Sequence, residues 1–222
     1  MQNQTKLIIF DLDGTLMDAY RAVWESVNYA LRKTDFPPES HANIKKNVGW
    51  GDKHLLRGLV GEHNVLRVLK IYRRHHAQAL QTGVRLMPGA RALLAELKKG
   101  GYRLAVASNR PRRFSLIALR VLGIRPFFDV VVCGDEVPRG KPAPDMFRRI
   151  LQRCNISPRE AVYVGDMTID VEAGRRAKIR TVAIPTGSCR RSELAALKPW
   201  KLIRSLKELR GFLGRAEGEK KS

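Results

Sequence analysis

Five short runs of apolar, largely β-branched residues constrain this sequence most strongly. They are Lys6–Phe10, Arg103–Ala107, Asp129–Cys133, Ala161–Val164 and Arg180–Ile184. Each run is continuous rather than alternating, which is typical of strands buried on both faces of a parallel sheet. Helical patterns fill most of the intervals between them. The alternation therefore predicts an α/β fold: a doubly wound, Rossmann-like parallel sheet with helices on both faces.

The interval between Phe10 and Ala90 departs from this rhythm because it contains no convincing strand. Its apolar spacing and its Pro and Gly breaks predict helices at Tyr20–Thr34, Glu39–Asn47, Lys53–Leu59 and Glu62–Thr82. The interval is too long for an ordinary strand–helix connection. We therefore predict an all-helical cap subdomain at residues 17–83, inserted into an α/β core formed by residues 1–16 and 84–214. The charged tail, residues 215–222, is expected to be disordered.

Composition excludes several classes of protein. The 222 residues are 44% hydrophobic and 28% charged, a balance typical of globular chains. No run approaches the ~20 apolar residues of a membrane-spanning helix. The first residues lack the pattern of a secretory signal, so we expect a cytoplasmic protein. The three cysteines form no C-x-x-C pair, which argues against structural zinc or a disulfide framework. The five histidines, all within residues 41–76, are interpreted as surface groups.

The chain is strongly basic, with 42 Lys and Arg residues against 21 Asp and Glu residues, a formal net charge of +21. A nucleic-acid-associated protein has such a charge. So does an enzyme whose field attracts anionic substrates, and so does a protein charged only for solubility. No motif for reading DNA or RNA is visible, and charge alone does not decide between these alternatives.

Polar residues follow four of the predicted strands, at the edge of the sheet where parallel strands bring their carboxyl ends together and bind ligands. They include Asp11 and Asp13 after the first strand, Ser108 and Asn109 after the second, Lys141 after the third, and Asp166 and Asp170 after the fourth. So many carboxylates at one edge repel one another unless a cation lies among them. An all-oxygen set of ligands favours Mg²⁺.

These motifs resemble those of the haloacid dehalogenase superfamily, in particular its phosphatases with a helical cap of the C1 type. Within it, the chain is most similar to the phosphoglycolate phosphatase-like group. The resemblance spans residues 6–188 and is carried by Asp11-Leu12-Asp13-Gly14-Thr15, Asn47-Val48-Gly49-Trp50-Gly51, Met87-Pro88-Gly89, Ser108-Asn109-Arg110-Pro111, Gly140-Lys141-Pro142-Ala143-Pro144 and Gly165-Asp166 with Asp170. It implies a Mg²⁺-dependent phosphatase that hydrolyses a small phosphomonoester through an aspartyl-phosphate.

Each strand-end residue then has an expected role. Asp11 attacks phosphorus, and Asp13 serves as general acid and then general base. Asp11 and Asp166 hold the metal, and the resemblance adds the backbone carbonyl of Asp13 as a further ligand. The remaining candidates surround the phosphoryl group. The Ser108 hydroxyl and the Asn109 backbone N–H bind it, Lys141 neutralises its charge, and Asp170 supports Lys141 or a metal-bound water.

The sequence departs from the family pattern at Met167, where Ser is common, and at Lys178, where Gly is common. Neither change removes a reacting group. The cap is expected to determine the substrate, and its candidate contacts are Tyr20, Trp50, Lys53 and Arg57. Contact with the substrate is one alternative for Arg110, Arg112 and Arg139, but in so basic a chain they are interpreted as ordinary surface side chains.

Alternative functions stay open at this point. The core motifs also fit a sugar phosphomutase similar to β-phosphoglucomutase, or a phosphatase of nucleotides or pyrophosphate. The alternative outside enzymes is the basic nucleic-acid-associated protein. The acid at Asp13 argues against a dehalogenase, since a halide leaving group needs no proton. We expect a monomer or a homodimer whose partner is a small phosphorylated anion, with no membrane association.

Overall fold

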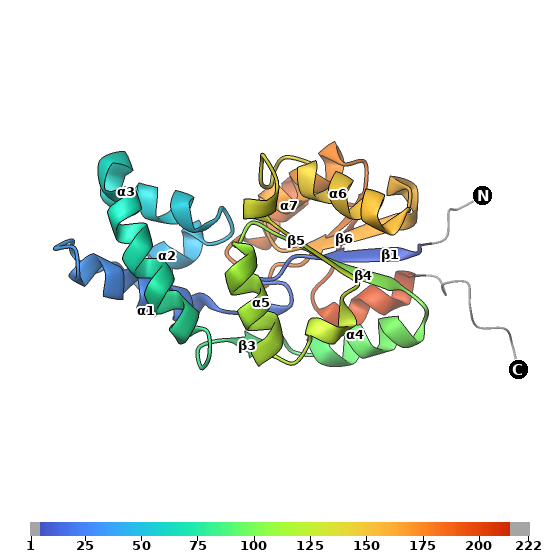
Figure 1. Cartoon of the computed structure of the whole chain (residues 1–222). Coiled ribbons are helices and arrows are strands. Elements are labelled where there is room, and N and C mark those ends of the chain that lie inside the picture. The colour runs from blue at the N-terminus through green and yellow to red at the C-terminus, as the bar shows by residue number, and fades with distance from the viewer. Residues whose placement is uncertain (1–4, 214–222) are drawn as a thin grey trace, which may run out of the picture.

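The computed structural model describes residues 5–213 and has a six-stranded parallel sheet at its centre (Figure 1). The chain builds one half of the sheet outward from β1 and then returns to the other side of β1, so the predicted doubly wound α/β fold is confirmed. In spatial order the strands are β5 (Val130–Cys133), β4 (Arg103–Ser108), β1 (Leu7–Phe10), β6 (Ala161–Gly165), β7 (Arg180–Ala183) and β8 (Lys201–Leu202). The order reverses between β1 and β6, and folds of this kind bind ligands at the carboxyl ends there.

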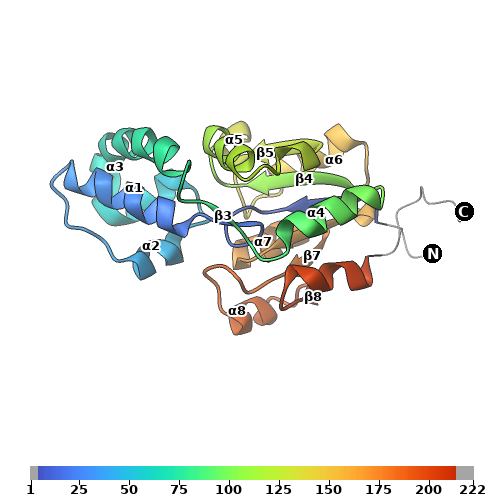
Figure 2. The same ribbon diagram turned by 90° about the horizontal axis from the view of Figure 1, so that it is seen from below.

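Helices cover both faces of the sheet, as Figure 2 shows. The helices α4 (Ala90–Lys99) and α5 (Arg112–Val121) pack on one face. The helices α6 (Asp145–Cys154) and α7 (Thr168–Arg176) pack on the other. Residues 5–213 also contain one more short helix and four 3₁₀ helices: α8 (Arg191–Ala196), η1 (Arg125–Phe127), η2 (Gly134–Glu136), η3 (Pro158–Glu160) and η4 (Leu206–Phe212).

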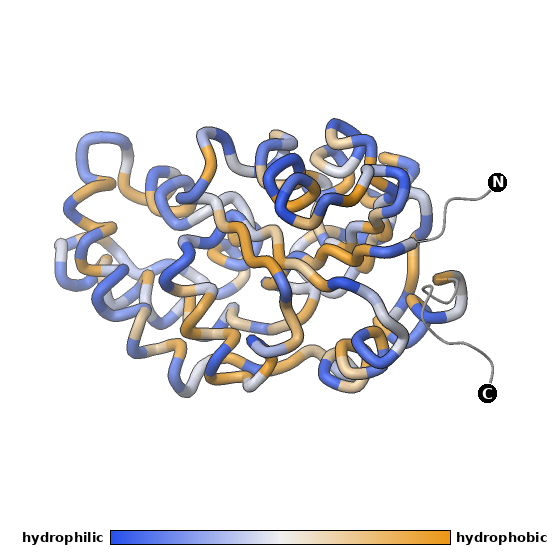
Figure 3. Tube along the Cα trace, turned by 45° about the vertical axis from the view of Figure 1, so that its right-hand side comes forward, coloured by the Kyte–Doolittle hydropathy of each residue, from blue (hydrophilic) through white to orange (hydrophobic). Residues whose placement is uncertain are grey.

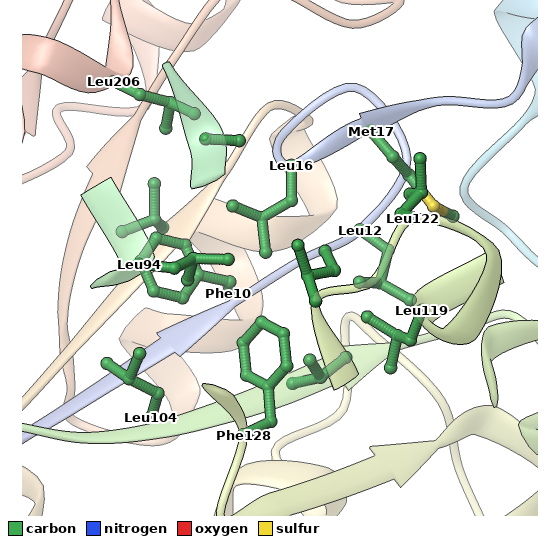
Figure 4. Close-up of a cluster of buried hydrophobic side chains, with 14 of the residues drawn as sticks. Phe10, Leu12, Leu16, Met17, Leu94, Leu104, Leu119, Leu122, Phe128 and Leu206 are labelled. Carbon is green, nitrogen blue, oxygen red and sulfur yellow. The ribbon is translucent and has the colours of Figure 1, made fainter. Parts of the chain in front are cut away.

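Both faces of the sheet are dry, which explains why the strands are continuously apolar. Alternate residues of β1 point to opposite faces, so Ile8 and Phe10 join the cluster of α4 and α5, whereas Leu7 and Ile9 join the cluster of α6 and α7. Figure 4 shows Phe10 packed among leucines of the first cluster. Each fully buried Leu, Ile or Phe stabilises the fold by roughly 1.5–3 kcal/mol. Figure 3 shows the hydrophobic residues concentrated along the central strands.

The predicted helical insert after β1 is confirmed and lies to the left of the sheet in Figure 1. It consists of α1 (Tyr20–Arg32), α2 (His41–Asn47) and α3 (Asp52–Ala79). These helices enclose a hydrophobic cluster of their own, which includes Val27, Ile44 and Val68. The cap therefore has its own packed interior. Its boundaries at residues 17 and 83 stay predictions.

A break within α3 separates the two helices that were predicted for this segment. Gly61 has φ 75° and ψ 168°, so the backbone there is not helical. Glycine reaches this conformation without the strain that a Cβ would add. The sequence correctly placed a helix on each side of Gly61, at Lys53–Leu59 and Glu62–Thr82.

Two very short strands were not predicted in this interval. They are β2 (Met17–Asp18) and β3 (Arg85–Leu86), which pair antiparallel where the chain leaves and re-enters the core. Two-residue strands leave no detectable hydrophobic period, and the same holds for β8. The tail at 215–222 lies outside the described residues. Within residues 5–213, no helix has the length and hydropathy to cross a lipid bilayer.

Candidate active site

The carboxylates that follow β1 and β6 meet at the point where the strand order reverses. The registers align Phe10 with Val164, and the Asp11 backbone N–H donates a hydrogen bond to the Val164 carbonyl at 2.9 Å. Carboxylate oxygens of Asp11, Asp166 and Asp170 consequently lie within 4.8 Å of one another, and all three side chains are buried. The sheet topology thus brings Asp11 beside two carboxylates that follow it by 155 or more residues in the sequence.

Asp166 has one oxygen that is satisfied and one that is not. Its Oδ1 accepts a hydrogen bond from Thr15 Oγ1 at 2.8 Å. Its Oδ2 is buried and has no hydrogen-bond partner in residues 5–213. Burial, reinforced by the charges of Asp170 and Asp11, raises the pKa of Asp166 well above its ordinary value. A carboxylate oxygen in this condition is the atom that a cation would stabilise most.

Two glycines leave room for the Asp166 carboxylate. A Cβ on Gly14, where φ is 82°, or on Gly187 would collide with the carboxylate oxygen Oδ2. Both positions therefore need a residue without a side chain for Asp166 to keep its orientation. The D-x-D-G-T motif thus contributes its glycine as well as its acids.

Lys141 donates hydrogen bonds to three neighbouring oxygens. Its Nζ contacts Asp11 Oδ1 at 2.7 Å, Asp170 Oδ1 at 2.8 Å and the Tyr163 hydroxyl at 2.9 Å. Burial alone would lower the pKa of Lys141, but Asp11 and Asp170 together raise it. Burial raises the pKa of Asp11 to about 7, although Lys141 acts in the opposite direction. One ammonium group therefore balances the charge of this acidic cluster only in part.

Asp170 is fully used as a hydrogen-bond acceptor. Its Oδ1 accepts from Lys141 and from the Tyr163 hydroxyl, and its Oδ2 accepts from the backbone N–H groups of Asp166 and Met167. It therefore orients Lys141 and the Asp166 turn. Asp11 and Asp166 are the residues that would hold a divalent cation. This all-oxygen set, with the unpartnered Asp166 Oδ2, fits Mg²⁺ chemically.

Ser108 and Asn109 lie at the end of β4, beside Asp11. Ser108 is buried and lines the same cavity as Asp11. The Asn109 side chain joins three segments: it donates to the Gly49 carbonyl at 2.9 Å and the Lys141 carbonyl at 3.0 Å, and it accepts from the Lys141 N–H at 2.7 Å. Asn109 thus fixes the Lys141 loop and contacts the cap loop, a structural role that the sequence did not indicate.

Arg110 is not the surface side chain that we expected. It is 8% exposed, and it forms a two-point ion pair with Asp13: Nε to Oδ2 at 2.9 Å and Nη2 to Oδ1 at 2.7 Å. Arg112 and Arg139 do pair with acids nearer the surface, Glu136 and Asp145. Arg110 follows Ser108-Asn109 directly. Ser108 and Asn109 were selected because they follow a predicted strand, and the same criterion would have selected Arg110.

His76 is also buried, contrary to the expectation that all five histidines lie at the surface. Its Nε2 contacts Arg110 Nη1 at 2.6 Å, its Nδ1 contacts Ser26 Oγ at 3.1 Å, and its ring stacks on Tyr72. Burial, together with the charge of Arg110, lowers the pKa of His76 well below its ordinary value. The residue is therefore neutral, and its Nε2 accepts a hydrogen bond from Arg110 Nη1–H. A sequence signal existed, because Val68, Tyr72 and His76 share one helical face.

The cap candidates occupy different positions. Tyr20 is buried, and its hydroxyl lies close to the Asp166 carboxylate. A Cβ added to Gly14 would collide with both groups. Trp50 is 40% exposed, stacks on His54 and lines an open hollow with Lys53 and Lys141. Arg57 pairs with Glu62 and is not among the described residues that line either hollow beside the acids.

Comparison with known proteins extends over both the sheet and the cap. The sequence matches the haloacid dehalogenase-like hydrolase family over residues 8–184. It is 32% identical over 193 residues to a phosphoglycolate phosphatase of Nitrosospira multiformis, covering 82% of this chain and 84% of that protein. It is 33% identical over 199 residues to a phosphoglycolate phosphatase of Rhodobacter capsulatus, covering 86% and 88%. The crystal structure of a predicted phosphoglycolate phosphatase from Haemophilus somnus superimposes with a TM-score of 0.88 at 25% identity, covering 96% of this chain and 100% of that one.

Proposed function

Because the chain belongs to the haloacid dehalogenase-like hydrolase family, we propose that it is a Mg²⁺-dependent phosphatase of a small phosphomonoester similar to phosphoglycolate. Membership in the family confirms the resemblance that the strand-end motifs indicated. The observation that carries the proposal is the buried pair Asp11 and Asp166, whose charge Lys141 compensates only in part and whose Asp166 Oδ2 has no partner among the described residues.

Asp11 begins the proposed reaction. One of its carboxylate oxygens forms a bond to phosphorus while the bond between phosphorus and the ester oxygen breaks, which gives an aspartyl-phosphate. Asp13 donates a proton to the departing oxygen, so the alcohol leaves uncharged. A water molecule then attacks phosphorus, Asp13 takes its proton, and Asp11 and inorganic phosphate are released.

The surrounding residues stabilise the phosphoryl group. Lys141 offers its positive charge beside Asp11, and Ser108 and the Asn109 backbone N–H offer hydrogen bonds from the end of β4. A Mg²⁺ ion on Asp11 and Asp166 would offset the repulsion between the nucleophile and the phosphate dianion. A cytoplasmic location and a monomeric or homodimeric state belong to the same proposal.

The proposal is tested by incubating the protein with phosphoglycolate, sugar phosphates, nucleotides and pyrophosphate, with and without Mg²⁺. Inorganic phosphate should appear with Mg²⁺ and be absent after chelation. An isomerised sugar phosphate without inorganic phosphate would identify a phosphomutase instead.

Asp11→Asn provides the matching variant, because it keeps the shape of the side chain and removes the nucleophile. We expect it to abolish turnover. Asp35→Asn is the control: Asp35 is exposed, and its φ of 62° is a conformation that Asn tolerates. Appreciable Mg²⁺-dependent hydrolysis by Asp11→Asn would reject the proposed mechanism.

A further inference from the structure

A cavity between the cap and the core contains Asp11 and Asp13 together with Arg110. The space in it that is open to a water molecule is small, about 40 Å³. Its cap side is largely apolar, with Val23, Leu55 and Tyr72 among the lining residues. Among the described residues that line it, Arg110 is the one basic side chain.

Arg110 keeps hydrogen-bond donors that its protein partners do not use. A guanidinium group has five N–H donors: one on Nε and two on each terminal nitrogen. Asp13 takes the Nε donor and one on Nη2, and His76 takes one on Nη1. Each terminal nitrogen therefore retains one N–H. Charged N–H donors of this kind form strong hydrogen bonds to carboxylate oxygens.

The orientation of Arg110 is fixed from both sides of the cavity. Asp13 holds the guanidinium from the core by two hydrogen bonds. His76 holds it from helix α3 of the cap, and the His76 ring is itself stacked on Tyr72 and packed edge-on against Phe114. Asp52, the other acid on the cap side of the cavity, is paired with Arg73 at 2.7 and 3.1 Å. A second anion would therefore meet a rigid donor and no unpaired acid on that side.

The contact with Asp13 sets the distance to the reacting ester. A general acid lies about 3 Å from the leaving oxygen, and Arg110 Nη2 lies 2.7 Å from Asp13 Oδ1. The guanidinium is thus within about 6 Å of the leaving oxygen. An anionic group on the carbon atom next to that oxygen can therefore reach the Arg110 guanidinium.

From this geometry we infer that Arg110 binds a second anionic group of the substrate and selects phosphomonoesters with a carboxylate next to the ester carbon. The inference rests on the proposed phosphatase function and goes beyond it, because it names the residue that recognises the leaving group. Asp13 then protonates the ester oxygen, while Arg110 binds the carboxylate on the adjacent carbon atom.

The test compares two substrates that differ in this one group: 2-phosphoglycolate and ethyl phosphate, in which a methyl group replaces the carboxylate. We would measure kcat/KM for both with wild type, Arg110→Lys and Arg110→Gln. The ratio of the two values cancels any loss that both substrates share through the disturbance of Asp13. A charge-assisted hydrogen bond contributes enough for the ratio to fall about ten- to a hundred-fold in Arg110→Gln. Arg110→Lys, which keeps the charge without the paired donors, should give an intermediate ratio.

Arg113→Gln is the matched control, because it removes a positive charge three residues away from an exposed position. Its ratio should equal that of wild type. Far-ultraviolet circular dichroism checks that each variant is folded. If folded Arg110 variants keep the wild-type ratio, or if wild type itself hydrolyses both esters equally well, the inference is overturned and the phosphatase function stands. If wild type hydrolyses no phosphomonoester, the proposed function fails, and the inference fails with it.

Discussion

Replacing Asp166 with Asn should stabilise the metal-free protein and remove the stabilisation that Mg²⁺ gives to wild type. In the metal-free protein, Asp166 Oδ2 is buried without a partner in the described chain, and Asp166 belongs to a cluster of three buried carboxylates. An Asn amide at this place keeps the hydrogen bond from Thr15 and brings no charge into the cluster. Without Mg²⁺, the variant should therefore be more stable than wild type.

The size of both effects follows from the site. A buried polar atom without a partner costs about 1–3 kcal/mol, and a domain of this length changes its Tm by about 2–4 °C per kcal/mol. The metal-free variant should therefore melt roughly 2–12 °C above wild type. Mg²⁺ at a hundred times its Kd stabilises wild type by about 2.7 kcal/mol. This corresponds to a rise of roughly 5–10 °C, which Asp166→Asn should lack.

The stability of the metal-free protein should also depend on pH in a specific direction. Burial raises the pKa of Asp11 from its ordinary value of 3.8 to about 7, and the pKa of Asp166 is raised as well. The folded state therefore binds protons that the unfolded chain releases. The resulting stability is full below about pH 4 and is lost as the pH rises through 7. Mg²⁺ should consequently stabilise the protein more at pH 8 than at pH 5.

Differential scanning calorimetry at pH 5 and pH 8, with and without Mg²⁺, measures these quantities. Asp35→Asn serves again as the control, since its exposed side chain should leave both the Tm and the Mg²⁺ response unchanged. A metal-free Asp166→Asn that melts below wild type would refute the argument from the unpartnered oxygen. An undiminished Mg²⁺ shift in that variant would refute Asp166 as a ligand.

Two further predictions concern the supports of the site. His76 is held neutral, whereas an unfolded chain protonates histidine below its ordinary pKa of 6.5, so acid should destabilise wild type through this residue. Equilibrium unfolding in urea should therefore show that His76→Gln gains stability relative to wild type as the pH falls from 7 to 5. A stability difference that does not change with pH would contradict a neutral His76. Gly187→Ala should displace the Asp166 carboxylate and reduce both hydrolysis and the Mg²⁺-induced rise in Tm. Its control is Gly58→Ala, which places a methyl group in open space on helix α3. This control should leave hydrolysis unchanged and add about 0.5–1 kcal/mol of stability. Equal losses of hydrolysis in both variants would contradict the role of Gly187.

The sequence predicted the sheet and its reacting edge because both follow from strong local patterns. Continuous apolar runs mark strands that are buried on both faces, and parallel connections force the ends of β1, β4 and β6 to one edge. Asp11, Ser108 and Asp166 could therefore be placed near one another from the sequence. The ribbon of β2 and β3 could not be found in this way, because its two-residue strands are defined only by their pairing across the cap.

The errors at Arg110 and His76 have a different physical origin. In a chain with a net charge of +21, one more arginine looks like a solvated side chain, and neither its composition nor its spacing reports an ion pair. The partner of Arg110 is Asp13, 97 residues away, and its contact with His76 spans 34 residues and joins the core to the cap. No periodic pattern sets how the cap helices lie over the strand ends.

This difference separates the chemistry of the site from its selectivity. The proposed reacting groups Asp11 and Asp166 stand at strand ends, where the hydrogen-bond register of the sheet fixes them, so each strand sequence carries the information for its own residue. The direction of the Arg110 guanidinium depends instead on His76, which the packing of α1 and α3 holds in place through Ser26 and Tyr72. A change in the packing of the cap can therefore alter which leaving group is bound while Asp11, Asp166 and Lys141 stay where they are. Selectivity between substrates should accordingly respond to substitutions at Ser26, which contacts His76 and does not line the cavity that contains Asp11.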